Sequence, residues 1–393
     1  MRIAVISRLV PRANFQSGDR RLIALMEILA RRHEVHFLGY LYSTPEDVSA
    51  CDALRRMGIT VHEKGWEGLV AATFRRAFDV AVFEFFDTFE MWGPEFRRRQ
   101  PGAALILDSV DVHFAREGAA AAIGLVDVDR VAETRRRELA AYRAVNAVIA
   151  VTDEDADLLR REDGMPPIFV IPNIVPLRAR VRRRRTPNAL FIGSFHHAPN
   201  VDAVGWFVTE VWPRVRSAVA DATASIVGVE MPSSLRALCD TPGVHVLGYV
   251  YDTGPCLDDA ALSIAPLRYG AGMKGKVNEA LAAGLPIVST GFGVQGLPIV
   301  NGVHAVVADD AESFAQAMVR MFNEPDAAET IGRAGQALAG RFSPEQVERL
   351  ISSMCDSIVA GRSRLRGRVV WMLAQFHVAG EAVIRRLRQA APL

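Results

Sequence analysis

The stretch that decides the fold runs from residue 266 to residue 286 and reads Pro266-Leu-Arg-Tyr-Gly-Ala-Gly-Met-Lys-Gly-Lys-Val-Asn-Glu-Ala-Leu-Ala-Ala-Gly-Leu-Pro286. An apolar run, Leu262–Ala265, precedes it, and a helical pattern, Lys274–Ala283, begins inside it. The loop between them is rich in glycine, with Gly270, Gly272 and Gly275. A strand, a glycine-rich loop and a helix in this order predict one βα unit of a parallel sheet. The free N–H groups at the start of such a helix favour an anionic ligand.

Two lysines mark the start of this helix in a chain that otherwise uses arginine. Of 46 basic residues, only Lys64, Lys274 and Lys276 are lysines. Helical spacing places Lys276 and Glu279 on one face, and places Val277, Ala280, Leu281 and Gly284 on the inward face. Cations are unfavourable at a helix N-terminus unless an anion binds there. We therefore predict an anion-binding role for these lysines over chance clustering or a solvated Lys–Glu pair.

The sequence of the glycine-rich loop is also similar to a P-loop motif. Gly270, Gly275 and Lys276 have the Walker spacing, but Val277 stands where Ser or Thr must ligate magnesium. A P-loop ATPase or kinase is therefore a distant alternative.

Outward from this stretch, both halves of the chain alternate apolar runs with helical patterns. Strands are expected at Ile3–Ile6, Val35–Leu38, Val80–Phe83, Ala104–Leu107 and Ala147–Val151, and again at Ala189–Ile192, Ala224–Val227, Val244–Leu247, Leu262–Ala265 and Pro286–Ser289. Helices are expected at Arg20–Arg32, Val131–Val145, Val201–Val219, Lys274–Ala283, Asp310–Phe322, Ala327–Ala339 and Pro344–Val359. Continuous apolar strands are typical of parallel sheets that helices cover on both faces.

This pattern predicts an α/β chain with two Rossmann-like doubly wound domains that face each other across a cleft. We place the first domain at residues 1–180 and the second at 186–345. The last three helices close the second domain, with 346–361 as the closing helix, and residues 362–393 form a helical tail. The basic run Arg178–Arg185 is expected to be an exposed linker between the domains.

Composition narrows the class of protein. The chain has 393 residues, is 50% hydrophobic and carries a formal net charge of +1, which argues against a nucleic-acid binder. Four scattered cysteines suit a reducing cytoplasm. The first apolar run is too short for a signal peptide, and no run has the length of a transmembrane helix. We therefore expect a cytoplasmic protein.

The stretch 266–286 resembles the donor-binding signature of retaining glycosyltransferases of family 4, which have the GT-B fold. In the most similar subgroup, a Gly-Ala-Gly-hydrophobic-Lys-x-Lys loop precedes Glu-Ala-x-Ala-x-Gly-x-Pro. The resemblance continues in Phe191-Ile-Gly-Ser-Phe-His-His-Ala-Pro-Asn-Val-Asp-Ala203, Leu107-Asp-Ser-Val-Asp-Val-His113, Ile171-Pro-Asn173 and Gly18. It spans nearly all of residues 1–345 and implies a nucleotide diphosphate sugar as co-substrate, with no cofactor and no metal.

Carried over by position, Glu279 matches the glutamate that holds the nucleotide ribose. The family's other glutamate falls at Ala271, and its usual Arg and Lys fall at Ser194 and Asn200. The usual phosphate clamp is therefore absent, and Arg268, Lys274 and Lys276 are the expected replacements. With Gly18, Ser194 and Gly272 these residues make up the predicted donor site.

His113 and Lys274 are the predicted catalytic residues. His113 follows a strand end, where an imidazole can donate to a sugar hydroxyl or phosphate, although a structural histidine is an equal alternative. The acidic triplets at Asp127–Asp129 and Asp153–Asp155 each begin a helix, so we interpret them as caps rather than metal ligands. His196-His197 lacks further ligands in sequence.

The predicted activity is retaining transfer of a hexosyl unit to an acceptor hydroxyl, in cell-surface polysaccharide or glycolipid assembly, with a saccharide or lipid-linked acceptor. Retention is implied by the resemblance alone. A GT-B-fold epimerase or phosphorylase remains an alternative. So does a non-catalytic scaffold that binds nucleotide sugars.

The tail, residues 362–393, has an apolar stripe at helical spacing that includes Trp371, flanked by arginines 362, 364, 366, 368, 385, 386 and 388. A basic amphipathic helix suits an anionic membrane surface, here the inner face of the membrane. Packing of the helix on the protein or on a second subunit is the alternative.

Overall fold

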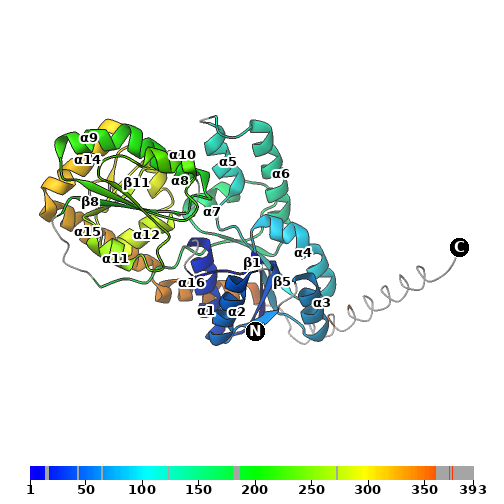
Figure 1. Cartoon of the computed structure of the whole chain (residues 1–393). Helices are drawn as coiled ribbons and strands as arrows, with labels where there is room; N and C mark the ends of the chain where they lie inside the picture. The colour runs from blue at the N-terminus through cyan, green and yellow to red at the C-terminus, as the bar shows by residue number, and fades with distance from the viewer. Residues whose placement is uncertain are drawn as a thin grey trace.

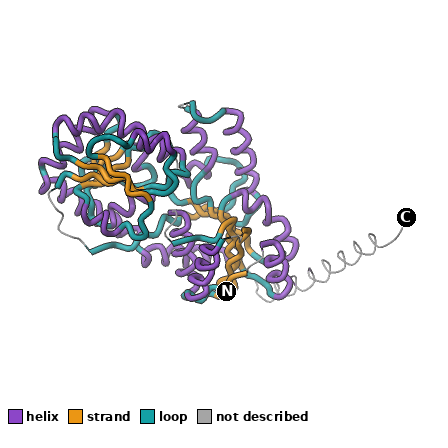
Figure 2. The backbone as a smooth tube through the Cα atoms, in the orientation of Figure 1, coloured by secondary structure: helices purple, strands orange, loops and turns teal. Residues whose placement is uncertain are grey.

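The computed structural model describes residues 1–13, 17–41, 44–62, 65–122, 124–179, 186–270 and 273–359, together with Trp371 and Ala374. Within these ranges the chain forms two α/β domains that lie side by side (Figure 1). Each domain has one parallel sheet enclosed by helices (Figure 2). The predicted fold class, two doubly wound domains, is confirmed.

The first domain is built on a seven-stranded sheet in the order β3-β2-β1-β4-β5-β6-β7. The strands are β1 (Arg2–Leu9), β2 (Glu34–Leu41), β3 (Thr60–His62), β4 (Val80–Glu84), β5 (Ala104–Asp108), β6 (Ala147–Ala150) and β7 (Ile168–Val170). The central strands β4, β5 and β6 are buried along their whole length, which explains their continuous apolar runs. Strands β3 and β7 are not predicted by the sequence, because three residues are too few to show a pattern.

The helices of the first domain cover both faces of this sheet. They are α1 (Ser17–Ala30), α2 (Pro45–Arg56), α3 (Gly65–Arg75), α4 (Phe86–Arg99), α5 (His113–Ala121), α6 (Val128–Arg143) and α7 (Asp153–Arg160). Two apolar clusters result, one on each side of the sheet, because neighbouring residues of a strand point to opposite faces. Helices α5 and α6 form a pair that extends beyond the sheet alongside the second domain (Figure 1).

The second domain repeats the design with six strands in the order β10-β9-β8-β11-β12-β13. Its strands are β8 (Asn188–Ile192), β9 (Thr223–Val227), β10 (Val244–Gly248), β11 (Leu262–Ala265), β12 (Ile287–Ser289) and β13 (Val306–Val307). Its helices are α8 (Ala198–Trp206), α9 (Trp212–Ala218), α10 (Ser233–Leu238), α11 (Gly254–Asp259), α12 (Gly275–Ala282), α13 (Gly291–Val294), α14 (Ala311–Asn323) and α15 (Pro325–Ala339).

The single helix expected at Val201–Val219 is in fact interrupted. A π-helical turn, Phe207–Val211, separates α8 from α9. Pro213 follows this turn, and its missing N–H and its ring are incompatible with a regular hydrogen bond to the residue four positions earlier. The wider turn accommodates the proline.

The last helix, α16 (Pro344–Val359), packs in the core of the first domain and does not close the second. Val347, Ile351 and Met354 are buried with residues of β1 and α1, and Glu348 pairs at 2.7 Å with Arg31, the residue after α1. Figure 1 shows this orange helix beside α1. The sequence predicts the helix from its periodicity, but an amphipathic pattern does not say which core its apolar face covers.

In both sheets the order of strands reverses beside the first strand, between β1 and β4 and between β8 and β11. Ligands of doubly wound sheets bind at this switch point, beyond the carboxyl ends of the strands. The glycine-rich loop after β11 and the segment 193–197 after β8 therefore flank the expected ligand position of the second domain.

The linker and the tail are described only in part. Arg178 is attached to the second domain rather than free, since its N–H donates to the Ala282 carbonyl at 3.1 Å and its own carbonyl accepts from Gln336. Residues 180–185 and the tail apart from Trp371 and Ala374 lie outside the described residues. The Trp371 indole donates to the Thr73 carbonyl of α3 at 3.0 Å. Among described residues, no helix has the length and apolarity needed to cross a membrane.

The packing of α16 predicts a contrast between two neighbouring residues. Ile351 is 2% exposed and Leu350 is 42% exposed. Ile351→Ala should lower the free energy of unfolding of the first domain by about 2–5 kcal/mol, whereas Leu350→Ala should change it by less than about 0.5 kcal/mol. Thermal or urea unfolding of the two variants measures the difference. Equal effects would show that α16 is not part of this core.

Candidate active site

Two helices of the second domain begin at its switch point, and neither is capped by a side chain. The N-cap of α8 is His197 and that of α12 is Lys274, and neither side chain accepts a capping hydrogen bond. Neither N-cap side chain thus occupies the first N–H groups of its helix, although Pro199 of α8 has no N–H to offer. The positive ends of both helix dipoles lie at the same edge of the sheet. This arrangement favours an anion.

Lys276 joins these two helices. Its ammonium donates to the Asn200 side chain of α8 and lies 4.2 Å from the centre of the Phe191 ring. In the resembling family, the position of Asn200 usually carries a cationic side chain. Here the ammonium of Lys276, which comes from α12, lies at that position instead. A Cβ atom on Gly193 would lie 3.1 Å from the ammonium, which explains the glycine. Burial, reinforced by the nearby Lys274, lowers the pKa of Lys276 to about 7.

Ser194 lies beside this lysine. Its hydroxyl is buried and makes no hydrogen bond within the described structure, while its carbonyl accepts from Asn200. Buried hydroxyls without a partner are uncommon in proteins, so this oxygen is available to a ligand.

Lys274 faces the first domain. Its side chain covers Gly270, whose φ of 146° is accessible to glycine, and a Cβ there would lie 3.3 Å from the lysine Cε. Burial lowers the pKa of Lys274 to about 8, against the opposing charges of Asp111, Asp155 and Glu154 of the first domain. The lysine is therefore held in the electrostatic field of three carboxylates across the domain interface.

Glu279 and Arg268 have different surroundings. The Glu279 carboxylate, 12% exposed, pairs with Arg20 of the first domain and accepts from the Thr253 hydroxyl at 3.3 Å. Arg268 pairs instead with Asp202 of α8, through a 2.9 Å hydrogen bond, and is half exposed. Its charge is thus already balanced. Gly272 lies outside the described residues.

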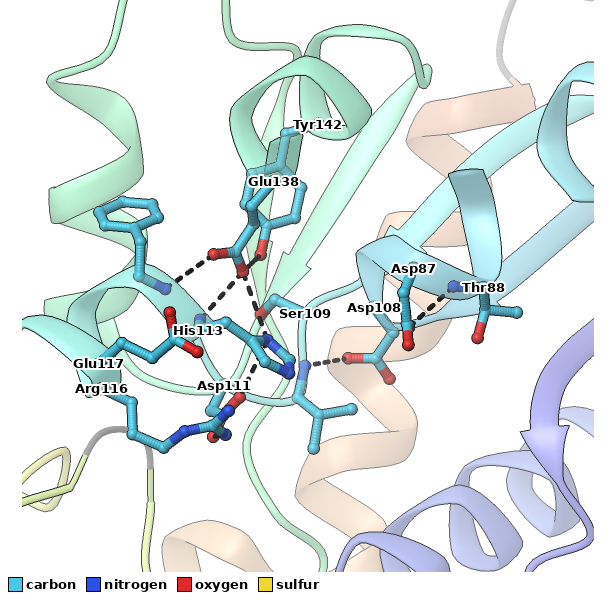
Figure 3. Close-up of polar contacts among 12 residues, drawn as sticks. Asp87, Thr88, Asp108, Ser109, Asp111, His113, Arg116, Glu117, Glu138 and Tyr142 are labelled. Atoms are coloured by element: carbon cyan, nitrogen blue, oxygen red, sulfur yellow. Dashed lines mark hydrogen bonds and ion pairs between the residues drawn. The ribbon is translucent and has the colours of Figure 1, made fainter. Parts of the chain in front are cut away.

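His113 begins α5 in the first domain, where Glu138 of α6 holds it (Figure 3). The buried Glu138 carboxylate accepts from the N–H groups of His113, at 3.0 Å, and Phe114, at 2.9 Å, and from the Tyr142 hydroxyl at 2.7 Å. A neighbouring helix thereby supplies the cap of α5. His113 does follow a strand end as expected, and it is also the first residue of a helix that the sequence did not predict.

The His113 ring is oriented by charge and by aromatic contacts. Its Nδ1 lies 3.3 Å from Asp111 and 3.6 Å from Glu138, and the rings of Phe85 and Phe86 meet it edge to face. Burial would lower the pKa of His113, but the contact with Glu138 and the charge of Asp111 outweigh it, so the pKa rises above 6.5. The two carboxylates therefore favour the protonated form of the ring.

Several residues of this interface were not singled out from the sequence. Arg116 pairs with Asp111 and contributes to the electrostatic surroundings of both Lys274 and His197. Asp111 and Arg116 follow β5 on the chain, so the rule that ligands bind beyond strand ends could have found them. The sequence offered no signal for Arg20, because it belongs to a run of ordinary helical arginines.

In the first domain, a buried ion pair holds α1, the end of β5 and the segment at Ile171 together. Arg21 of α1 pairs with Asp108 at the end of β5, and it donates to the Ile171 carbonyl at 2.9 Å. Gly18 lies one turn away at the start of α1. Beside the pair, Ser7 donates to Glu84, and burial raises the pKa of Glu84 to about 8.

Both acidic triplets lie at helix starts, but only Asp127 is itself a cap, because Thr152 precedes the second triplet and takes that role. Asp127 caps α6 by accepting from the Asp129 N–H, and Thr152 caps α7 by accepting from the Asp155 N–H. In the described ranges, no group of three or more His, Cys, Asp or Glu side chains is arranged to hold a metal. Val277 lies on the buried face of α12 and is 1% exposed. This contradicts the P-loop alternative, because the residue at this position would have to point toward the ligand to bind magnesium.

The Glu138 contact predicts a change in the titration of His113. Glu138→Gln should lower the His113 pKa, because the carboxylate charge is lost while burial remains. The stability from protonated His113 is present below its unfolded pKa of about 6.5 and is lost as pH rises through the raised folded pKa. NMR titration of the imidazole measures the shift, with Glu133→Gln, exposed on the same helix, as the control. A pKa that is equal in both variants contradicts this account.

Comparisons with known proteins agree with this geometry. Residues 186–324 match the family described as "Glycosyl transferases group 1". A protein of Klebsiella pneumoniae named "Uncharacterized 44.6 kDa protein in cps region" is 27% identical over 146 residues, which are 34% of this chain and 36% of the relative. The match thus spans about a third of that relative's length.

Solved glycosyltransferase structures share the fold over nearly the whole chain. Sucrose-phosphate synthase from Thermosynechococcus elongatus has a TM-score of 0.72 at 15% identity, covering 92% of this chain and 100% of that one. TarM of S. aureus, solved with UDP, scores 0.70 at 11% identity and covers 90% and 99%. Anabaena HepE, solved with UDP-glucose, scores 0.67 at 14% identity and covers 91% and 100%. The fold is GT-B, and the family match in the second domain supports the superfamily of group 1 glycosyltransferases.

Proposed function

We propose that this protein transfers a sugar from a nucleotide diphosphate sugar to an acceptor hydroxyl. The observation that carries the proposal is the convergence of two uncapped helix N-termini, α8 and α12, with Lys276 and the unpartnered Ser194 hydroxyl. A diphosphate would meet N–H groups, a hydroxyl and cations at one place. Relatives of the same fold were solved with UDP or UDP-glucose, which agrees with a nucleotide donor.

In the proposed reaction, negative charge grows on the departing phosphate as the bond to the sugar breaks. Lys274 and Lys276 stabilise that charge in a partly buried site, where preorganised cations act more strongly than in water. The protein's own cations thus take the part that a metal ion plays in other enzymes, and no cofactor is required. Glu279 holds the ribose hydroxyls, as its position in the resemblance implies.

The first domain supplies the sugar and acceptor side. His113, whose pKa Glu138 and Asp111 raise, donates to a sugar hydroxyl or a phosphate oxygen. We propose retention at the anomeric carbon and a hexosyl donor from the family 4 resemblance. The relative from a cps region favours a saccharide or lipid-linked acceptor in polysaccharide assembly.

Nucleotide binding and its pH dependence test the donor site. The affinity for UDP or GDP should fall with rising pH, because the protonated lysines bind the diphosphate. The fall should begin near pH 7 in the wild type, where Lys276 titrates, and near pH 8 in Lys276→Arg, where only Lys274 does. Isothermal titration calorimetry between pH 6.5 and 8.5 measures this. The donor site fails if neither nucleotide binds at any pH.

Turnover tests the role of Lys274. Lys274→Ala should lower kcat by about a hundredfold or more, the scale of losing one preorganised donor. Lys274→Arg should recover part of the rate, because the guanidinium keeps the charge but has a different shape. Release of nucleoside diphosphate from the nucleotide sugar measures both, with the exposed Arg333→Ala as control, and EDTA should leave all rates unchanged. Wild-type rates in Lys274→Ala would end the assignment.

For the tail we propose a basic surface that contacts the cytoplasmic face of an anionic membrane. The arginines of the tail supply the positive charge. The hydrogen bond from Trp371 to Thr73 attaches the tail to the first domain, which agrees with the alternative that the tail packs on the protein. Deletion of residues 362–393 should abolish co-sedimentation with phosphatidylglycerol liposomes and leave nucleotide binding intact. If the full chain ignores such liposomes at low salt, only the packing role remains.

A further inference from the structure

An ion pair joins the first domain to Glu279, the residue that the proposed function assigns to the ribose. Arg20 of α1 donates to Oε1 of Glu279, on α12 of the second domain. The other carboxylate oxygen, Oε2, accepts from Thr253 of the second domain at 3.3 Å. Both oxygens of Glu279 therefore have donors before any nucleotide is present.

Arg20 is well placed to hold this contact. The next residue, Arg21, is 3% exposed and anchored to Asp108, so the backbone of α1 is fixed relative to the first sheet. The Arg20 side chain is 41% exposed, and it extends to Glu279, which is 12% exposed. The contact joins residues 259 positions apart, and it exists only while the two domains lie together.

We propose that Arg20 competes with the donor for Glu279, so that the ribose hydroxyls displace it when the nucleotide binds. The inference rests on the proposed function. Each carboxylate oxygen can accept two hydrogen bonds, but only 12% of the Glu279 side chain is exposed, so the accessible sites for a ribose diol are those that Arg20 and Thr253 use. A hydroxyl group can rotate away, but a guanidinium must leave. Nucleotide binding therefore breaks a contact between the domains and frees Arg20.

The competition lowers the apparent affinity for the nucleotide. Only the fraction of molecules with a released Glu279 binds the ribose, and the measured Kd increases by the inverse of that fraction. A partly exposed ion pair of this kind corresponds to a weakening of up to about fivefold. The ion pair thus couples occupation of the donor site to the contact between the domains.

Calorimetry with two ligands tests the inference. The first is whichever of UDP and GDP binds the wild type more tightly, and the second is its 2′,3′-dideoxy form. Arg20→Gln should bind the ribose nucleotide about threefold to fivefold more tightly than the wild type. It should bind the dideoxy nucleotide with wild-type affinity, because that ligand leaves the Arg20–Glu279 pair intact.

Two variants serve as controls. Arg31→Gln removes a different ion pair, which Arg31 makes just after α1 with Glu348 of α16, and should leave both affinities unchanged. In a Glu279→Gln background, Arg20→Gln should have no effect on the ribose nucleotide, since the competition requires the carboxylate.

The possible results separate this inference from the proposed function. Weaker binding by Arg20→Gln means that Arg20 contacts the nucleotide directly, and unchanged binding means that it does not compete; either result overturns the inference while the donor site stands. Equal wild-type affinity for the ribose and dideoxy nucleotides removes the ribose role of Glu279 and the inference with it. If no nucleotide binds to any variant, the proposed function fails as well.

Discussion

The buried ion pair between Arg21 and Asp108 sets the geometry on which the rest of the site depends. It joins α1 to the end of β5, and through the bond to the Ile171 carbonyl it also holds the segment that leads to the second domain. Removal of either partner would leave an unpaired buried charge, which costs about 3–5 kcal/mol. Arg20 is the residue before Arg21, and His113 lies five residues after Asp108.

The second domain presents the complementary half of the site as a concentration of positive charge. Lys276, stacked on Phe191 and bonded to Asn200, lies where the positive ends of α8 and α12 already meet. Burial and the second lysine lower its pKa, so without an anion the ammonium is poorly stabilised. A diphosphate would relieve this, which is the physical reason why we regard the arrangement as a donor site. Across the interface, Asp111 and its neighbours balance Lys274.

Sequence patterns predicted those features that depend on residues close together along the chain. The strands that were expected from apolar runs all exist, and the loop and helix at 266–286 fold as a βα unit at the switch point, because burial on both faces leaves a continuous signal in sequence. The patterns did not predict contacts between residues that are far apart along the chain. The periodicity of α16 gave no sign of which core it joins, and Pro213 alone hinted at the π-helical turn.

The sequence by itself determined the two doubly wound domains, the glycine-rich loop, and the choice of Lys274, Lys276, Glu279 and His113 as candidates. Only the tertiary structure decided how these residues are used: that Lys276 reaches Asn200, 76 positions away, that Glu138 holds His113, and that Arg20 occupies Glu279. Secondary structure follows from neighbours along the chain, whereas the partner of a charged side chain depends on how helices and sheets pack, which no local pattern encodes.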